Sequence, residues 1–253
     1  MRTFAPPQTP RTGPVLALAI QAAWLISSLV CTPAALANDR PFDVARTATA
    51  EDDDQSWGFS TWARVNRDGR SLSMEPEYAF SPENSIQLEL SRQWDRRGAE
   101  SGLGAEFEFK HLFNQLARDG WAWGLSASLG AQRDQGSRNW NPSVTVRWPV
   151  SLDLRALAGG DAGGPLLHLN LGAEKARHAP RQGLKAVAAE QAITPRWLVF
   201  AEWSQQADES ARQVGVRHWL RKEKWAVDLA WHRRNQGGER DGAWLLGMSW
   251  SDL

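Results

Sequence analysis

The sequence has one cysteine, no long apolar run after its first residues, and almost no excess charge. The single cysteine, Cys31, falls in a predicted leader, so the rest of the chain has neither disulfides nor thiolate metal sites. No later apolar run is long enough to cross a membrane as a helix. Lys+Arg and Asp+Glu number 29 each, and this balance gives no general attraction to nucleic acid.

Residues 1–37 have the organisation of a secretory signal peptide. Arg2 and Arg11 supply positive charge, residues 14–30 form an apolar core, and the small residues 35–37 make a cleavage site before Asn38. The alternative is an uncleaved anchor, because the core is close to transmembrane length. Cleavage would remove two of the 29 basic residues and leave 27 against 29 acidic ones, a net charge near −2.

The region after the leader, residues 38–56, has few apolar residues and an acidic run at 51–54. This composition predicts a mobile periplasmic lead-in. The predicted organisation is therefore a signal peptide (1–37), a lead-in (38–56) and a folded domain (57–253).

The folded domain is organised around a strand pattern that is clearest at residues 121–131, WAWGLSASLGA. Every second residue is apolar, beginning with Trp121 and Trp123, and the residues between are small or weakly polar. Side chains alternate across a strand, so this segment has one apolar face and one polar face. An apolar face that begins with tryptophan is typical of a lipid interface, and the polar face suits a wet interior.

The same alternation recurs along the domain and predicts twelve strands. We place them at 57–65, 72–80, 86–94, 103–110, 121–131, 140–148, 167–174, 183–193, 197–204, 214–217, 225–231 and 244–250. An even number is expected when both ends of a bacterial barrel are periplasmic. Odd-numbered connections are polar and of moderate length, and several even-numbered ones are tight, as in such barrels. Residues 150–164 are long enough to contain a further strand, which would change the count.

Alternation alone does not distinguish a membrane barrel from a soluble one, in which the apolar face is inside. The tryptophans favour the membrane. Fourteen of the fifteen lie beyond the leader, and most are near predicted strand ends, where aromatic girdles occur. These are Trp94, Trp121, Trp123, Trp140, Trp148, Trp197, Trp203, Trp219, Trp225, Trp244 and Trp250. We therefore predict an all-β, antiparallel transmembrane barrel in the outer membrane of a Gram-negative envelope.

Four stretches resemble a known family: GLGAEFEF (102–109), LHLNLG (167–172), VGVRHWL (214–220) and LGMSW (246–250). They are similar to the transporter-like outer-membrane barrels related to the meta-pathway phenol-degradation family. The resemblance implies an outer-membrane barrel with a transport role. Such chains commonly end in an aromatic residue, whereas this one ends Trp250-Ser251-Asp252-Leu253, so the signal for the barrel-assembly machinery is weakened or shifted inward.

Enzyme signatures are missing from the sequence. It has no phosphate loop, paired-histidine metal motif or nucleotide fingerprint. Outer-membrane lipid hydrolases need a serine beside a histidine, usually two residues apart on one strand. None of the five histidines (His111, His168, His178, His218, His232) has that spacing, although a distant pair stays open. We predict a protein that is not an enzyme and has no cofactor or metal.

The functional candidates are the charged and polar residues of the predicted inner face. They are Glu75, Glu77, Glu89, Glu106, Glu108, Lys110, Arg147, His168, Asn170, Glu174, Arg217 and Asp228. Five glutamates crowd three of the early strands, about 4.8 Å apart, and form an acidic wall that would favour cations. The alternative is that acids and bases pair with each other across a small lumen.

The sequence predicts a narrow channel for a small solute that it does not identify, with a closed structural or envelope-interaction barrel and a lipid-modifying enzyme as alternatives. Outer-membrane lipids and the assembly machinery are the expected partners. Arginines of the predicted external loops, such as Arg96, Arg97, Arg133, Arg138, Arg233 and Arg234, are expected to contact lipopolysaccharide phosphates.

Overall fold

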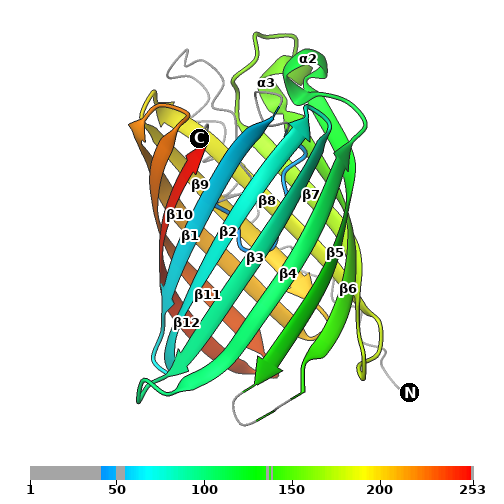
Figure 1. Cartoon of the computed structure of the whole chain (residues 1–253). Helices are drawn as coiled ribbons and strands as arrows, with labels where there is room; N and C mark the ends of the chain where they lie inside the picture. The colour runs from blue at the N-terminus through cyan, green and yellow to red at the C-terminus, as the bar shows by residue number, and fades with distance from the viewer. Residues whose placement is uncertain (1–40, 50–54, 135–136, 138, 252–253) are drawn as a thin grey trace, which may run out of the picture. The chain divides into compact units, whose positions relative to one another are not determined.

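The computed structural model describes residues 41–49, 55–134, 137 and 139–251. Within them twelve antiparallel strands form a closed barrel, in which β1 pairs with β12 (Figure 1). The strands are β1 (Ser56–Val65), β2 (Gly69–Ser81), β3 (Asn84–Asp95), β4 (Glu100–Leu112), β5 (Trp121–Asp134), β6 (Asn141–Asp153), β7 (Leu166–Ala176), β8 (Gln182–Thr194), β9 (Trp197–Gln206), β10 (Glu209–Arg221), β11 (Trp225–Gln236) and β12 (Glu239–Ser251). The predicted fold class and strand count are confirmed. The predicted signal peptide lies outside the described residues and stays a prediction.

Each strand has one face toward the lumen and one away from it. On β7, Leu169 and Leu171 are 37% and 66% exposed, whereas His168 and Asn170 between them are 0% and 2% exposed. Large apolar side chains are exposed on every strand of the barrel. A continuous apolar outer surface of this kind is unfavourable in water and is covered by lipid in a membrane barrel.

Tryptophan on the outer face lies near both ends of the strands. Trp57, Trp197 and Trp225 open β1, β9 and β11, while Trp140 and Trp244 lie toward the opposite end, and all five are exposed. Trp219 departs from the predicted girdles, because it is buried on the inner face beside Arg217. Trp62 is also inside, where its ring lies on Gly247 and leaves no room for a β-carbon at that position.

The odd-numbered connections are shorter than the sequence predicted, whereas the tight even-numbered ones, at residues 82–83, 195–196 and 222–224, are confirmed. At the end where β1 ends and β12 begins, which we name the loop end, strands extend into the predicted loops and leave turns as short as residues 207–208 and 237–238. Polar residues can continue a strand there, because the rim of the barrel lies beyond the lipid and neither face has to be apolar. The longest connections lie at the end where β1 begins and β12 ends, named here the terminal end.

Two of the connections at the terminal end contain short helices, α2 (Leu116–Asp119) and α3 (Leu154–Leu157) (Figure 1). The Asp153 carboxylate caps α3 by accepting from Arg155 N and Ala156 N, both at 3.0 Å. Residues 150–164 therefore hold the end of β6 and a helical turn, with no further strand. No helix among the described residues is long and apolar enough to cross a membrane.

Candidate functional site

The lumen of the barrel is the candidate site. Nine of the twelve residues predicted to line it are buried on the inner face: Glu75, Glu77, Glu108, Lys110, Arg147, His168, Asn170, Arg217 and Asp228. The other three, Glu89, Glu106 and Glu174, are half-buried. Glu89 lines a cavity, Glu106 approaches two arginines, and Glu174 accepts a hydrogen bond from Gln206.

The predicted acidic wall is largely neutralised by bases. Arg147 lies 3.1 Å from Glu108 and 3.7 Å from Glu106, and Lys110 lies 3.8 Å from Glu77. Arg46 adds a second guanidinium, whose Nε donates to Glu108 at 3.2 Å. Arg46 is not among the predicted lumen residues, because its segment was predicted to be a mobile periplasmic lead-in. The pairing alternative therefore describes these carboxylates better than an uncompensated wall.

A second ion pair links β10 and β11. Arg217 donates from Nε and a terminal nitrogen to the two carboxylate oxygens of Asp228, at 2.7 and 3.0 Å. The two residues lie directly opposite each other in the strand register and are 1% and 0% exposed. This bidentate geometry is the strongest form of an arginine–carboxylate contact, and it holds two adjacent strands together inside the wall.

Residues 41–49 lie inside the lumen, which corrects the prediction of a mobile lead-in for this part of 38–56 (Figure 1, blue). Phe42, Ala45, Thr47 and Ala48 are 0% exposed. We name these nine residues the lumen segment. Its contacts run from Arg64, near the loop end of β1, to Ser151, near the terminal end of β6, so the segment passes along much of the lumen.

The lumen segment is held mainly through its backbone, whose polar groups need partners once water is removed. The Glu202 carboxylate accepts from three successive amides, Asp43 N at 2.6 Å, Val44 N at 2.9 Å and Ala45 N at 2.7 Å. The Asn170 side chain binds both the N–H of Arg46, at 3.0 Å, and its carbonyl, at 2.9 Å. Polar residues of the inner wall thus replace the strand partners that the segment lacks.

Asn170 was predicted to be a polar residue of the inner face, next to a wet lumen. The structure places it 2% exposed against Arg46, with Arg147 on the next strand. An arginine at position 170 would remove both hydrogen bonds to Arg46. It would also place a third guanidinium group beside those of Arg46 and Arg147, which repel it, so the position is intolerant of arginine.

Ser151 and His168 form the distant serine–histidine pair that the sequence left open. They lie opposite each other on β6 and β7, with Ser151 Oγ 2.8 Å from His168 Nδ1, and Glu190 Oε1 lies 3.6 Å from His168 Nε2. Ser151 Oγ also accepts from Ala48 N at 2.8 Å, and the Phe42 ring lies 5.3 Å from the imidazole. The lumen segment therefore covers this group of residues.

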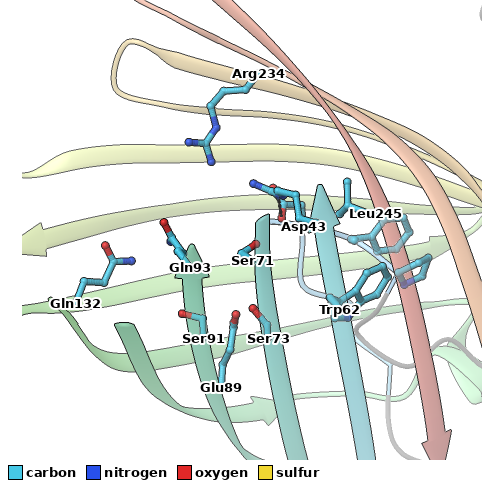
Figure 2. A pocket seen from close by; sticks show the side chains of 13 residues that line it. Asp43, Trp62, Ser71, Ser73, Glu89, Ser91, Gln93, Gln132, Arg234 and Leu245 are labelled. Carbon is cyan, nitrogen blue, oxygen red and sulfur yellow. Dashed lines mark hydrogen bonds and ion pairs between the residues drawn. The ribbon is translucent and has the colours of Figure 1, made fainter. Parts of the chain in front are cut away.

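A polar cavity of about 270 Å³ lies between the lumen segment and the loop end (Figure 2). The lumen segment contributes Pro41, Phe42 and Asp43 to its lining, and Arg64 is bound to Asp43 at 2.7 Å. Hydrogen-bonding side chains of β2, β3 and β5 line one wall, and Arg234 of β11 points in from another. The wall residues are Ser71, Ser73, Glu89, Ser91, Gln93 and Gln132. The described residues contain no group of three His, Cys, Asp or Glu placed to hold a metal.

We expect a thiol placed in the lumen segment to be protected from reagents. In a chain with Cys31 replaced by serine, Ala45→Cys should react far more slowly with a bulky maleimide than Ser137→Cys, because Ala45 is 0% exposed and Ser137 is exposed. The measurement is the labelling rate of the folded protein in detergent, with urea-unfolded protein as the control. Equal rates in the folded state would mean that the segment leaves the lumen freely.

No protein-family model and no curated protein matches the chain. Among solved structures it is similar to the KdgM porin, at 8% identity over 76% of this chain and 98% of that chain, with a TM-score of 0.56. A structure described as the KdgM porin in complex with disordered oligogalacturonate gives the same values. The outer membrane protein Omp33 of Acinetobacter baumannii aligns at 8% identity over 78% of this chain and 97% of that chain, with a TM-score of 0.47.

At 8% identity the similarity to the KdgM porin is one of fold. That fold, together with the apolar outer face and the polar lumen, defines the class of protein. The chain is a closed, twelve-stranded antiparallel β-barrel with a porin-like fold, an apolar outer face and a polar lumen.

Proposed function

We propose that this protein is a narrow channel for small solutes, closed in the described state by its own lumen segment. The observation that carries the proposal is the cavity of about 270 Å³ whose lining includes Phe42 and Asp43 of the lumen segment. A solute entering from the loop end would meet hydrogen-bonding side chains and then the segment. Twelve strands enclose a lumen between the filled eight-stranded barrels and the open porins, so one extended chain is enough to obstruct it.

The comparisons support solute passage as a general class. The similar structures include a porin whose description names oligogalacturonate, a property of that protein. For this chain we infer only that a small polar solute suits the cavity, because its walls are rich in serine and glutamine. As part of the same proposal, the chain is a member of the family of barrels related to phenol degradation. Its partners are outer-membrane lipids and the barrel-assembly machinery.

Side chains of the inner wall hold the segment in place, so a substitution in the wall would weaken its binding. The three backbone amides bound by Glu202 are its densest set of contacts, and each bond to a charged acceptor contributes about 1.5–3 kcal/mol. Removal of this one carboxylate therefore weakens the closed state without altering the outer face of the barrel.

We expect Glu202→Ala to open the channel. Loss of even one such bond corresponds to about a tenfold rise in the open fraction, so planar-bilayer recordings should show higher mean conductance than the parent. Glu239→Ala, an exposed acid at the loop end, is the matched control and should behave like the parent. If folded Glu202→Ala protein stays silent, the channel proposal fails and the closed barrel is favoured.

The closed structural barrel is the second candidate, and the buried ion pairs favour it. Arg217–Asp228 joins the neighbouring strands β10 and β11, Arg147–Glu108 links β6 to β4 across β5, and both pairs fill space in the lumen. A barrel selected only for passage would not require such contacts beneath its surface. The conductance of Glu202→Ala separates the two candidates.

The third alternative is an enzyme that uses Ser151, and we propose that the protein is not one. Ser151 Oγ holds Ala48 N, and Phe42 covers His168, so both side chains contribute to binding the lumen segment. In this proposal Glu190 orients the imidazole, and the set anchors the segment rather than activating a nucleophile.

A further inference from the structure

A cluster of arginine and tryptophan lies on the outer face at the loop end, on four consecutive strands and the start of the next. We name it the arginine–tryptophan cluster. It consists of Arg70 on β2, Arg92 and Trp94 on β3, Glu100 on β4, Arg133 on β5 and Trp140 just before β6.

The contacts within the cluster hold the guanidinium groups in place. Arg70 and Arg92 both lie over the Trp94 ring, at 5.7 and 5.3 Å from its centroid. The Glu100 carboxylate contacts Arg92 at 2.8 Å and Arg133 at 3.5 Å. Arg133 also lies 5.5 Å from the centroid of Trp140. Stacking on an indole fixes the plane of a guanidinium while leaving its edge available for hydrogen bonds.

The position of the cluster is at the edge of the lipid-facing surface. Arg70, Arg92 and Arg133 continue the outward rows that contain Met74, Leu90 and Leu129, which are 44%, 48% and 63% exposed. Headgroups of a bilayer lie directly beyond its hydrocarbon core, at the level where tryptophan gathers. In a bacterial barrel with an even number of strands, the first strand begins and the last strand ends on the periplasmic side, which makes the loop end the outer one.

The cluster carries more positive charge than its own residues neutralise. It has three guanidinium groups and one carboxylate, and the Arg92 side chain is 53% exposed although it is paired. A guanidinium has five N–H donors, and one carboxylate occupies only a fraction of those in the cluster. Arg70 and Arg92 lie on neighbouring strands, about 4.8 Å apart, a spacing that lets their guanidinium groups share one phosphate. Arg133 lies one strand further along, beyond β4, and is linked to Arg92 through Glu100.

We propose that the arginine–tryptophan cluster binds a phosphate of lipopolysaccharide in the outer leaflet, with Arg70, Arg92 and Arg133 as the donors. Trp94 and Trp140 hold the guanidinium planes, and the apolar rows beneath them contact the acyl chains. The sequence predicted that the arginines of the external loops contact lipopolysaccharide, but the structure places these arginines in different environments. Arg133 belongs to the site, Arg234 instead pairs with Glu209 and lines the cavity, and Arg138 is outside the described residues.

The test is lipid binding by the full mature protein in detergent, followed by native mass spectrometry. The probes are diphosphorylated lipid A and the same lipid after enzymatic dephosphorylation, and inorganic phosphate serves as a competitor without acyl chains. We compare the parent with Arg70→Gln, Arg92→Gln and Arg133→Gln, singly and combined. Arg221→Gln, an exposed arginine at the terminal end of β10, is the matched control.

We expect one lipid A adduct on the parent, about tenfold weaker binding for each single variant, and loss of the adduct in the triple variant. Arg221→Gln should bind as the parent does, and dephosphorylated lipid should bind weakly to every protein. Equal binding of lipid A by a folded triple variant, shown by heat-modifiable migration, would overturn the proposal. So would equal binding of the dephosphorylated lipid, or displacement of lipid A by millimolar inorganic phosphate. None of these readouts depends on conductance.

Discussion

Leu169→Arg should prevent stable insertion of the barrel. Leu169 lies on the outer face of β7, 37% exposed, with Val150 and Val187 beside it on the neighbouring strands. A charged side chain on the lipid face near the bilayer midplane costs about 2–4 kcal/mol, a large share of the stability of a small domain. The readout is heat-modifiable migration after refolding into lipid vesicles, in which a folded barrel migrates differently from the unfolded chain.

Leu169→Phe is the control, because it keeps an apolar side chain at the same position and should fold as the parent does. A lower folded yield for Leu169→Arg in vesicles, and a smaller deficit in detergent, would identify lipid contact as the cause. If Leu169→Arg and Leu169→Phe fold equally well in vesicles, the outer face of β7 is not in lipid.

Asp228→Ala should destabilise the folded barrel by about 3–5 kcal/mol, because it leaves the Arg217 guanidinium buried without its carboxylate. Arg217 is 1% exposed and donates hydrogen bonds to both carboxylate oxygens of Asp228. The measurement is the free energy of unfolding from urea titration in lipid vesicles.

Two control variants distinguish the effect of leaving a charge buried without a partner from the effect of removing any ion pair. The double variant Arg217→Met/Asp228→Leu removes both charges and should be close to the parent, since apolar replacement of a buried pair is often neutral. Glu209→Ala breaks the exposed pair with Arg234 and should cost about 1 kcal/mol or less. A loss in Asp228→Ala no larger than that in Glu209→Ala would contradict a buried, desolvated pair.

The class of fold is readable from the sequence because a barrel strand is defined by local alternation. The row Leu167, Leu169, Leu171 beside His168 and Asn170 shows both faces of β7 without any knowledge of its partners. The strand ends were less predictable. Polar residues such as Arg233 and Gln236 at the rim have no face pattern, yet they pair with β12.

The charged residues of the lumen were also identifiable from the alternation, but their partners were not. Direct cross-strand pairs such as Arg217 and Asp228 depend on the register, which the sequence left unspecified. Ser151 and His168 likewise meet only because β6 and β7 pair at those positions. The expected spacing of two residues between serine and histidine applies within one strand, so it does not detect a pair formed between two neighbouring strands.

The alternating strands of the sequence by themselves determined a twelve-stranded membrane barrel with a polar lumen and an apolar outer face. Only the tertiary structure decided that the lumen is occupied. The lumen segment has no strand or helix pattern, and its partners are distant, with Ala45 separated from Glu202 by 157 residues and Arg46 from Asn170 by 124. Backbone amides are identical in every residue, so a chain held by its backbone leaves no periodic signal in its side chains.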